Sequence, residues 1–78
     1  NRMTDPEVAA LRLDELIAEM VKDAGAELDE AGRWALAATN SQGSDEMYTA
    51  SKRSEAHHRT LALVYHNIVV RLKTIRRK

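Results

Sequence analysis

The chain contains a single cluster of turn-forming residues, Asn40-Ser41-Gln42-Gly43, close to its midpoint. The segment before it begins with Thr4-Asp5-Pro6-Glu7, which combines a capping residue, a proline in the first turn and a glutamate that can close a capping box. In the segment after it, Ser44 or Asp45 can cap a helix, and no glycine or proline follows up to Arg76. The sequence therefore predicts an all-α protein, a long antiparallel hairpin of two helices over residues 6–39 and 45–76, joined by a turn at 40–44.

Gly25 leaves one alternative to this hairpin. Read alone, Ala24-Gly25 is typical of a helix C-terminus, which would give three helices over 6–24, 27–39 and 45–76. The apolar spacing runs through Gly25 without a change of phase, which favours one continuous helix. Ala18, Gly25 and Gly32 are also seven residues apart, and close approach of a neighbouring helix would explain two interior glycines.

Both predicted helices carry apolar positions that alternate four and three residues apart, as in coiled coils. In the first, the seam is Ile17, Val21, Ala24, Leu28, Ala31, Ala35 and Ala38. In the second, it is Met47, Ser51, Ser54, His58, Leu61, Tyr65, Ile68, Leu72 and Ile75. We expect the core to contain Leu13, Ile17, Met20, Leu28, Leu61, Tyr65, Ile68 and Leu72. We also expect Trp34 to fill space against Tyr48 and Ala50, and His58 to be an interior histidine with a hydrogen-bond partner.

Charge is divided between the two halves. Residues 1–40 carry four Lys/Arg and nine Asp/Glu, whereas residues 41–78 carry eight and three. Folding at the turn would bring Asp14, Glu15 and Glu19 close to Arg71 and Lys73, so we expect pairing between the helices to use much of this complementarity.

A two-helix hairpin cannot cover all of its apolar positions. Val8 and Leu11 in the first helix, and Leu63 and Val70 in the second, lie outside the seams. The chain has no cysteine, so disulfides cannot supplement so small a core. We therefore expect a homodimer that forms a four-helix bundle.

A row of basic residues, Lys52, Arg59, His66 and Lys73, recurs every seven residues, and Arg77 lies close to the same line. We call this row the basic stripe. Leu63 and Val70 lie among these cations, a mixture that suits a protein partner better than a phosphate backbone. The leading hypothesis is a homodimeric adaptor or regulatory module that binds another protein through Lys52, Arg59, Leu63, His66, Val70, Lys73 and Arg77. The alternative is a nucleic-acid-binding regulator that uses the same face and the C-terminal tail.

Glu55 and His58 supply the only other candidate chemistry. Their Glu-x-x-His spacing is the one by which ferritin-like bundles present ligands to a metal pair, and a metal bundle is the third hypothesis. The signal is weak, because any charged helix has Glu and His three residues apart by chance, so we expect a surface glutamate beside a boundary histidine, with no metal site and no cofactor. No nucleophile arrangement or phosphate-binding loop is present in the sequence, and we do not expect an enzyme.

The whole chain is expected to be a single domain, residues 1–78, with residues 1–4 flexible. Asn1 and Arg2 precede Met3, and we expect them to be additions to a chain that begins at Met3. No apolar run approaches the length of a membrane span, and no signal peptide is visible, so a cytoplasmic location is expected without membrane contact.

Overall fold

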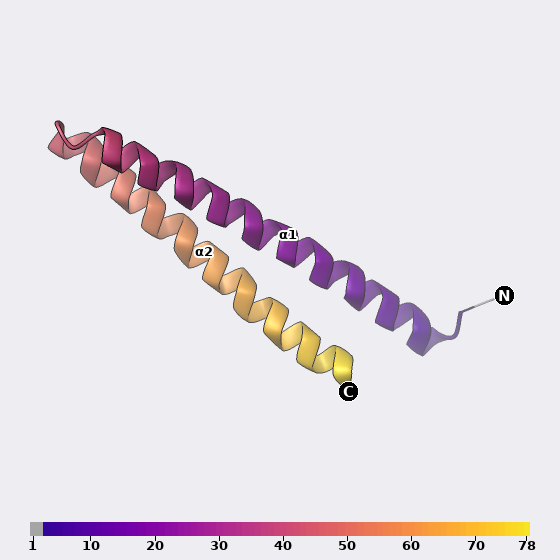
Figure 1. Ribbon diagram of the computed structural model, residues 1–78. Helices are drawn as coiled ribbons and strands as arrows, with labels where there is room; N and C mark the ends of the chain where they lie inside the picture. Colours follow the sequence, from indigo (N-terminus) through magenta and orange to yellow (C-terminus); the bar gives the residue numbers. More distant parts are fainter. Residues whose placement is uncertain (1–2) are drawn as a thin grey trace.

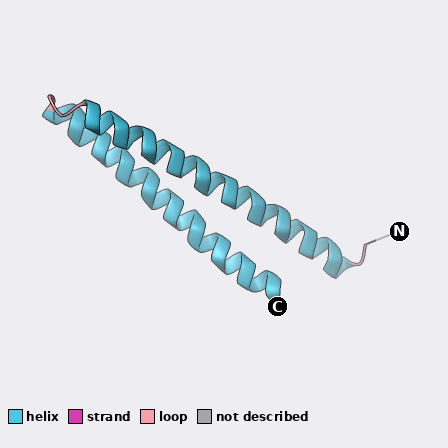
Figure 2. Ribbon diagram, viewed as in Figure 1, coloured by secondary structure: helices cyan, strands magenta, loops and turns pink. Residues whose placement is uncertain are grey.

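The computed structural model describes residues 3–78 as two long antiparallel helices (Figures 1 and 2). Helix α1 spans Asp5–Asn40 and helix α2 spans Asp45–Arg77. The described residues contain no strand, so the predicted all-α hairpin is confirmed. The expectation about Asn1 and Arg2 lies outside the described residues.

Each helix begins at a side-chain cap. The Thr4 hydroxyl accepts a hydrogen bond from the Glu7 backbone N–H, and the Glu7 carboxylate accepts one from the Thr4 N–H, both at 3.3 Å. This is the capping box that the sequence predicted. At the start of α2, Ser44 accepts from the Met47 N–H at 3.4 Å. The two caps fix where the chain enters each helix.

The predicted alternative of a break at Gly25 is wrong, because α1 runs through it as one helix of 36 residues. No glycine among the described residues has a positive φ. The expected reason for the glycines is also absent within the hairpin, since a Cβ added at Gly25 or Gly32 would meet nothing within 4 Å. Both glycines therefore lie on a side of α1 that α2 does not cover.

The hairpin is a single layer of helices. Its extents are 63 × 21 × 12 Å, and the smallest is about the diameter of one helix with its side chains. The residues buried between the helices are small or polar for the most part: Ala31, Ala38, Ser51, Glu55, Ala62 and Val69. The two flat faces of the layer are left to solvent.

The structure agrees with six of the eight predicted core residues and differs at two. Leu13, Ile17, Met20, Leu61, Tyr65 and Leu72 are half-buried. Leu28 is 58% exposed and Ile68 is 37% exposed, and the seam positions Val21, Met47 and Ile75 are exposed too. A single neighbouring helix buries only a narrow row of side chains. On α2 this row includes Val69, which is buried, and not Ile68.

Two further predictions need correction. Trp34 is 36% exposed, and Tyr48 and Ala50 are exposed, so Trp34 is not core filling in the single hairpin. Only two polar side-chain contacts join the helices among the described residues, the ion pair of Arg76 with Asp14 at 2.9 Å and the hydrogen bond between His58 and Glu27 at 2.5 Å. Arg71 and Lys73 lie on exposed positions of α2 and do not take part in them. Fewer acidic residues of α1 therefore pair with basic residues of α2 than the sequence predicted.

Leu11, Leu63 and Val70 are exposed, as predicted for positions outside the seams, whereas Val8 is half-buried. Neither of the helices described at residues 3–78 is long and apolar enough to cross a bilayer.

Candidate binding surface

The basic stripe lies along one side of α2. Seven residues are close to two helical turns, so Lys52, Arg59, His66 and Lys73 repeat at nearly the same angle around the helix. All four are exposed, as are Arg77 and the two apolar residues among them, Leu63 and Val70. The structure therefore places all seven predicted binding residues at the surface of the hairpin.

Glu55 is a member of this surface that the sequence analysis did not assign to it. Its carboxylate accepts from the Lys52 ammonium at 2.9 Å and from the Arg59 guanidinium at 2.7 Å, while Glu55 itself is only 6% exposed. Spacings of three and four residues place both cations beside it on the helix. That spacing is visible in the sequence and would have identified Glu55 as their partner.

The ion pairs shift the titration of both Glu55 and Lys52. The hydrogen bond from Lys52 lowers the pKa of the Glu55 carboxyl below its ordinary value, and the charge of Arg59 acts in the same direction. The same hydrogen bond raises the pKa of Lys52. Glu55 therefore neutralises part of the basic stripe and holds Lys52 and Arg59 in place.

A shallow groove of about 510 Å³ runs between the helices beside the stripe. We call it the basic groove, and its lining residues are Ala24, Leu28, Arg59, Ala62, Leu63 and His66. Four of these side chains are apolar, and Arg59 and His66 supply the polar rim. Leu28 comes from α1, and the sequence analysis missed its role because its spacing had placed it in the core.

The structure divides the predicted binding residues into groups. Arg59, Leu63 and His66 line the basic groove. Val70 lies in a separate hollow on the outer surface of α2, with Val64, Asn67, Ile68 and Arg71. Lys52 belongs to the Glu55 cluster, while Lys73 and Arg77 make no ion pair with any described residue.

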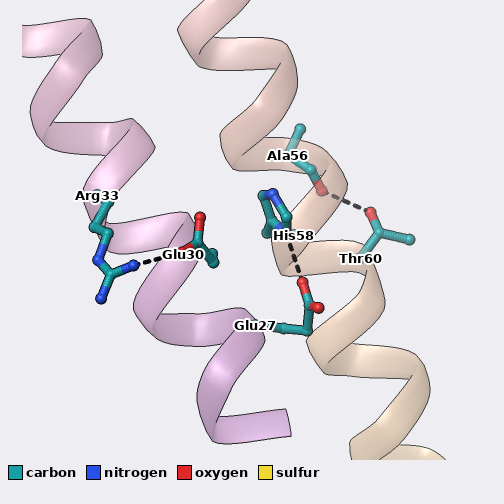
Figure 3. A network of polar contacts seen from close by, with 6 residues as sticks. All are labelled: Glu27, Glu30, Arg33, Ala56, His58 and Thr60. Atoms are coloured by element: carbon teal, nitrogen blue, oxygen red, sulfur yellow. Dashed lines mark hydrogen bonds and ion pairs between the residues drawn. The ribbon is translucent and has the colours of Figure 1, made fainter. Parts of the chain in front are cut away.

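The candidate metal ligands do not come together. Glu55 is engaged by Lys52 and Arg59, whereas His58 Nδ1 contacts Glu27 Oε2 across the helix interface (Figure 3). Within residues 3–78, no three His, Asp or Glu side chains gather closely enough to hold a metal ion. His58 has the hydrogen-bond partner that was expected, a residue of α1 that lies 31 positions earlier in the chain, but it is half-buried rather than interior.

No protein-family model, curated protein sequence or solved structure matches this chain.

Proposed function

We propose that this protein is an interaction module that works as a homodimer and binds an acidic amphipathic helix of another protein in the basic groove. The observation that carries the proposal is the groove itself, which joins an apolar floor from both helices to the polar edge formed by Arg59 and His66. Helix-in-groove recognition uses this combination, with apolar anchors in the groove and charges at its edge.

The charges of the stripe favour a protein partner over nucleic acid. Phosphate binding depends on cations that can release counterions, and here Lys52 and Arg59 are already paired with Glu55. The chain as a whole has zero formal charge. An acidic helix needs only a few complementary charges, because Leu28 and Leu63 would supply apolar burial.

The test is affinity purification from an extract of the native cells, with the wild type and a Leu28→Glu/Leu63→Glu variant. We expect one protein to be retained by the wild type and lost from the variant, and the complex to form more slowly at high salt. Met47→Glu is the matched control, because Met47 is exposed near the turn and outside the groove. Circular dichroism must show equal helix content in all three proteins.

The opposite result would be retention of nucleic acid that nuclease treatment removes. Its affinity should then fall with salt at a slope of about −0.9 per phosphate contact. Lys73→Gln/Arg77→Gln would reduce that slope without disturbing Glu55. Such binding by the wild type at physiological salt, weakened by the double change, would replace the protein partner with nucleic acid.

A further inference from the structure

The flat face opposite the basic groove is also apolar. Leu16 and Trp34 are eighteen residues apart, which is five helical turns, so they share one side of α1, about 120° around from Leu28. On α2, Ile68 lies about 140° around the helix from Leu63, with Val64 one turn before it and Ile75 two turns after it. We call this surface the aliphatic face, and its exposed members are Leu16, Trp34, Val64, Ile68 and Ile75.

Half-buried side chains extend the aliphatic face toward the helix interface. Leu13 and Met20 adjoin Leu16 at spacings of three and four residues, and Leu61 lies seven residues before Ile68. Each is incompletely covered by the opposite helix. The aliphatic face therefore has the composition of a core that is covered on one side only.

The exposed area indicates how much surface remains to be covered. The hairpin exposes 6253 Å², whereas a compact monomer of 8.8 kDa exposes about 4,800 Å². The excess of about 1,500 Å² exceeds the roughly 800 Å² per partner of a standard interface and falls in the range of obligate dimers. A second hairpin is the occupant of matching size, because two such layers make one four-helix bundle.

Charges along the edges of the aliphatic face favour one of two ways in which two copies could pack, α1 against α1 or α1 against α2. The α1 edge is acidic on balance, because Asp23 and Glu30 lie seven and fourteen residues after Leu16 and Arg12 is the basic residue at the same angle as Glu30. The α2 edge is basic on balance, because His57 and Arg71 lie seven residues on either side of Val64 and Arg53 lies four residues before His57, with Glu46 the acidic residue at the same angle as Val64. Packing α1 against α1 of the partner would place acid against acid, whereas packing α1 against α2 of the partner places acid beside base.

We infer that the aliphatic face is the homodimer interface and that α1 of each copy packs against α2 of the other. The two turns then lie at the same end of the bundle, and every neighbouring pair of helices is antiparallel. The Glu27–His58 and Asp14–Arg76 pairs set the register of the hairpin, so Glu30 lies level with His57 of the partner subunit. This inference rests on the proposed homodimer and leaves the basic groove free on the outside of the bundle.

Cross-linking between single-cysteine variants tests the inference, because the natural chain has no cysteine. Glu30→Cys and His57→Cys proteins are mixed and oxidised. Each chain has one thiol, so a disulfide between positions 30 and 57 can join only two different chains. We expect the mixture to form a covalent dimer at least about tenfold faster than either variant alone, because a disulfide requires Cβ atoms roughly 4 Å apart.

The matched control uses Gly25→Cys and Leu63→Cys, which lie at a similar level on the groove side. This mixture should cross-link no faster than its separate components. Faster linking by the control pair than by the first pair would place the second copy on the groove and overturn the inference. Cross-linking by neither mixture, while the wild type sediments as a dimer, would also overturn it and leave the proposed homodimer intact.

Sedimentation gives an independent readout. Val64→Glu/Ile68→Glu should raise the dimer dissociation constant at least about 100-fold, because it buries two unpaired charges in the interface. Leu28→Glu should leave that constant within about threefold of the wild type. A dimer that withstands the Val64/Ile68 change contradicts the inference, whereas a wild type that is monomeric at every concentration contradicts the proposed homodimer itself.

Discussion

The half of the hairpin next to the turn and the half next to the termini are built differently. Near the turn, small or short side chains such as Ala31, Ala38 and Ser51 are buried. Toward the termini, larger side chains such as Ile17 and Tyr65 stay half-buried, and Val69 is the one large side chain that is buried among the described residues there. Small residues let two helices approach until one partner covers the contact line, whereas bulky residues hold the helices apart and leave a surface that needs another neighbour. Packing between the two helices covers the contact line near the turn, and association is expected to cover the aliphatic face in both halves, because Trp34 near the turn is exposed as well.

The largest effect is expected in the terminal half. Ile68→Ala should lower the free energy of unfolding by about 2–4 kcal/mol if a second copy covers the aliphatic face. Chemical denaturation at several protein concentrations measures this, and the midpoint should rise with concentration. A loss below about 0.5 kcal/mol would mean that Ile68 stays in solvent and that the terminal half is already complete.

A change near the turn should act by crowding. Ala31→Leu should cost about 1–3 kcal/mol, because the buried Ala31 side chain leaves no room for a larger one. Ala26→Leu, at an exposed position of α1, is the control and should change stability by less than about 0.5 kcal/mol. Equal tolerance of both changes would show that the helices near the turn are not closely packed.

Gly25 lies on the groove side of α1, and its replacement distinguishes the two faces. Gly25→Ala should stabilise the protein by up to about 1 kcal/mol, since Ala is the better helix former and its Cβ meets nothing within 4 Å. Thermal unfolding of the dimer measures the change. Destabilisation would place a second copy against the glycines instead of the aliphatic face.

The Glu55 cluster should give the smallest effect, seen as a dependence on pH. The pKa of Glu55 is lowered in the folded state, so its pairing stabilises the fold above the ordinary value of 4.5 and is lost as the pH falls through the lowered value. Lys52 has a raised pKa, so its contribution persists up to its ordinary value of 10.5 and is lost as the pH rises through the raised value. The unfolding midpoint of wild type should exceed that of Glu55→Gln at about pH 7, and the difference should shrink at about pH 3. A difference that is constant with pH would mean that the ion pairs contribute nothing to stability.

The sequence was sufficient to predict the two helices, but it was not sufficient to predict which residues of each helix contact the other. Caps at Thr4 and Ser44 and an unbroken apolar spacing across Gly25 determine the hairpin. The contact line was mistaken because two lines of four-and-three spacing share Ile17, Ala24 and Ala31. One of them adds Val21 and Leu28, and the other adds Met20 and Glu27. Apolarity favoured the first, but Glu27 faces inward because His58 of α2 pairs with it.

For the candidate surface, the heptad spacing of the cations correctly predicted a common exposed side on α2. The groove could not be predicted, because it depends on which residues of α1 lie beside Ala62 and Leu63. Which residues of α1 lie beside α2 depends on the contact line between the helices. Because the sequence allows two contact lines on α1, it could not show that Leu28 lies in the groove instead of the core.

Sedimentation equilibrium of the wild-type protein over nanomolar to micromolar concentrations tests most directly whether a second copy covers the exposed surface of the hairpin. A hairpin that leaves about 1,500 Å² of excess surface should associate, so the mass should approach twice 8.8 kDa at micromolar concentration and fall toward 8.8 kDa on dilution. A mass of 8.8 kDa at every concentration, together with cooperative unfolding, would contradict the account, because one layer of two helices would then be stable alone.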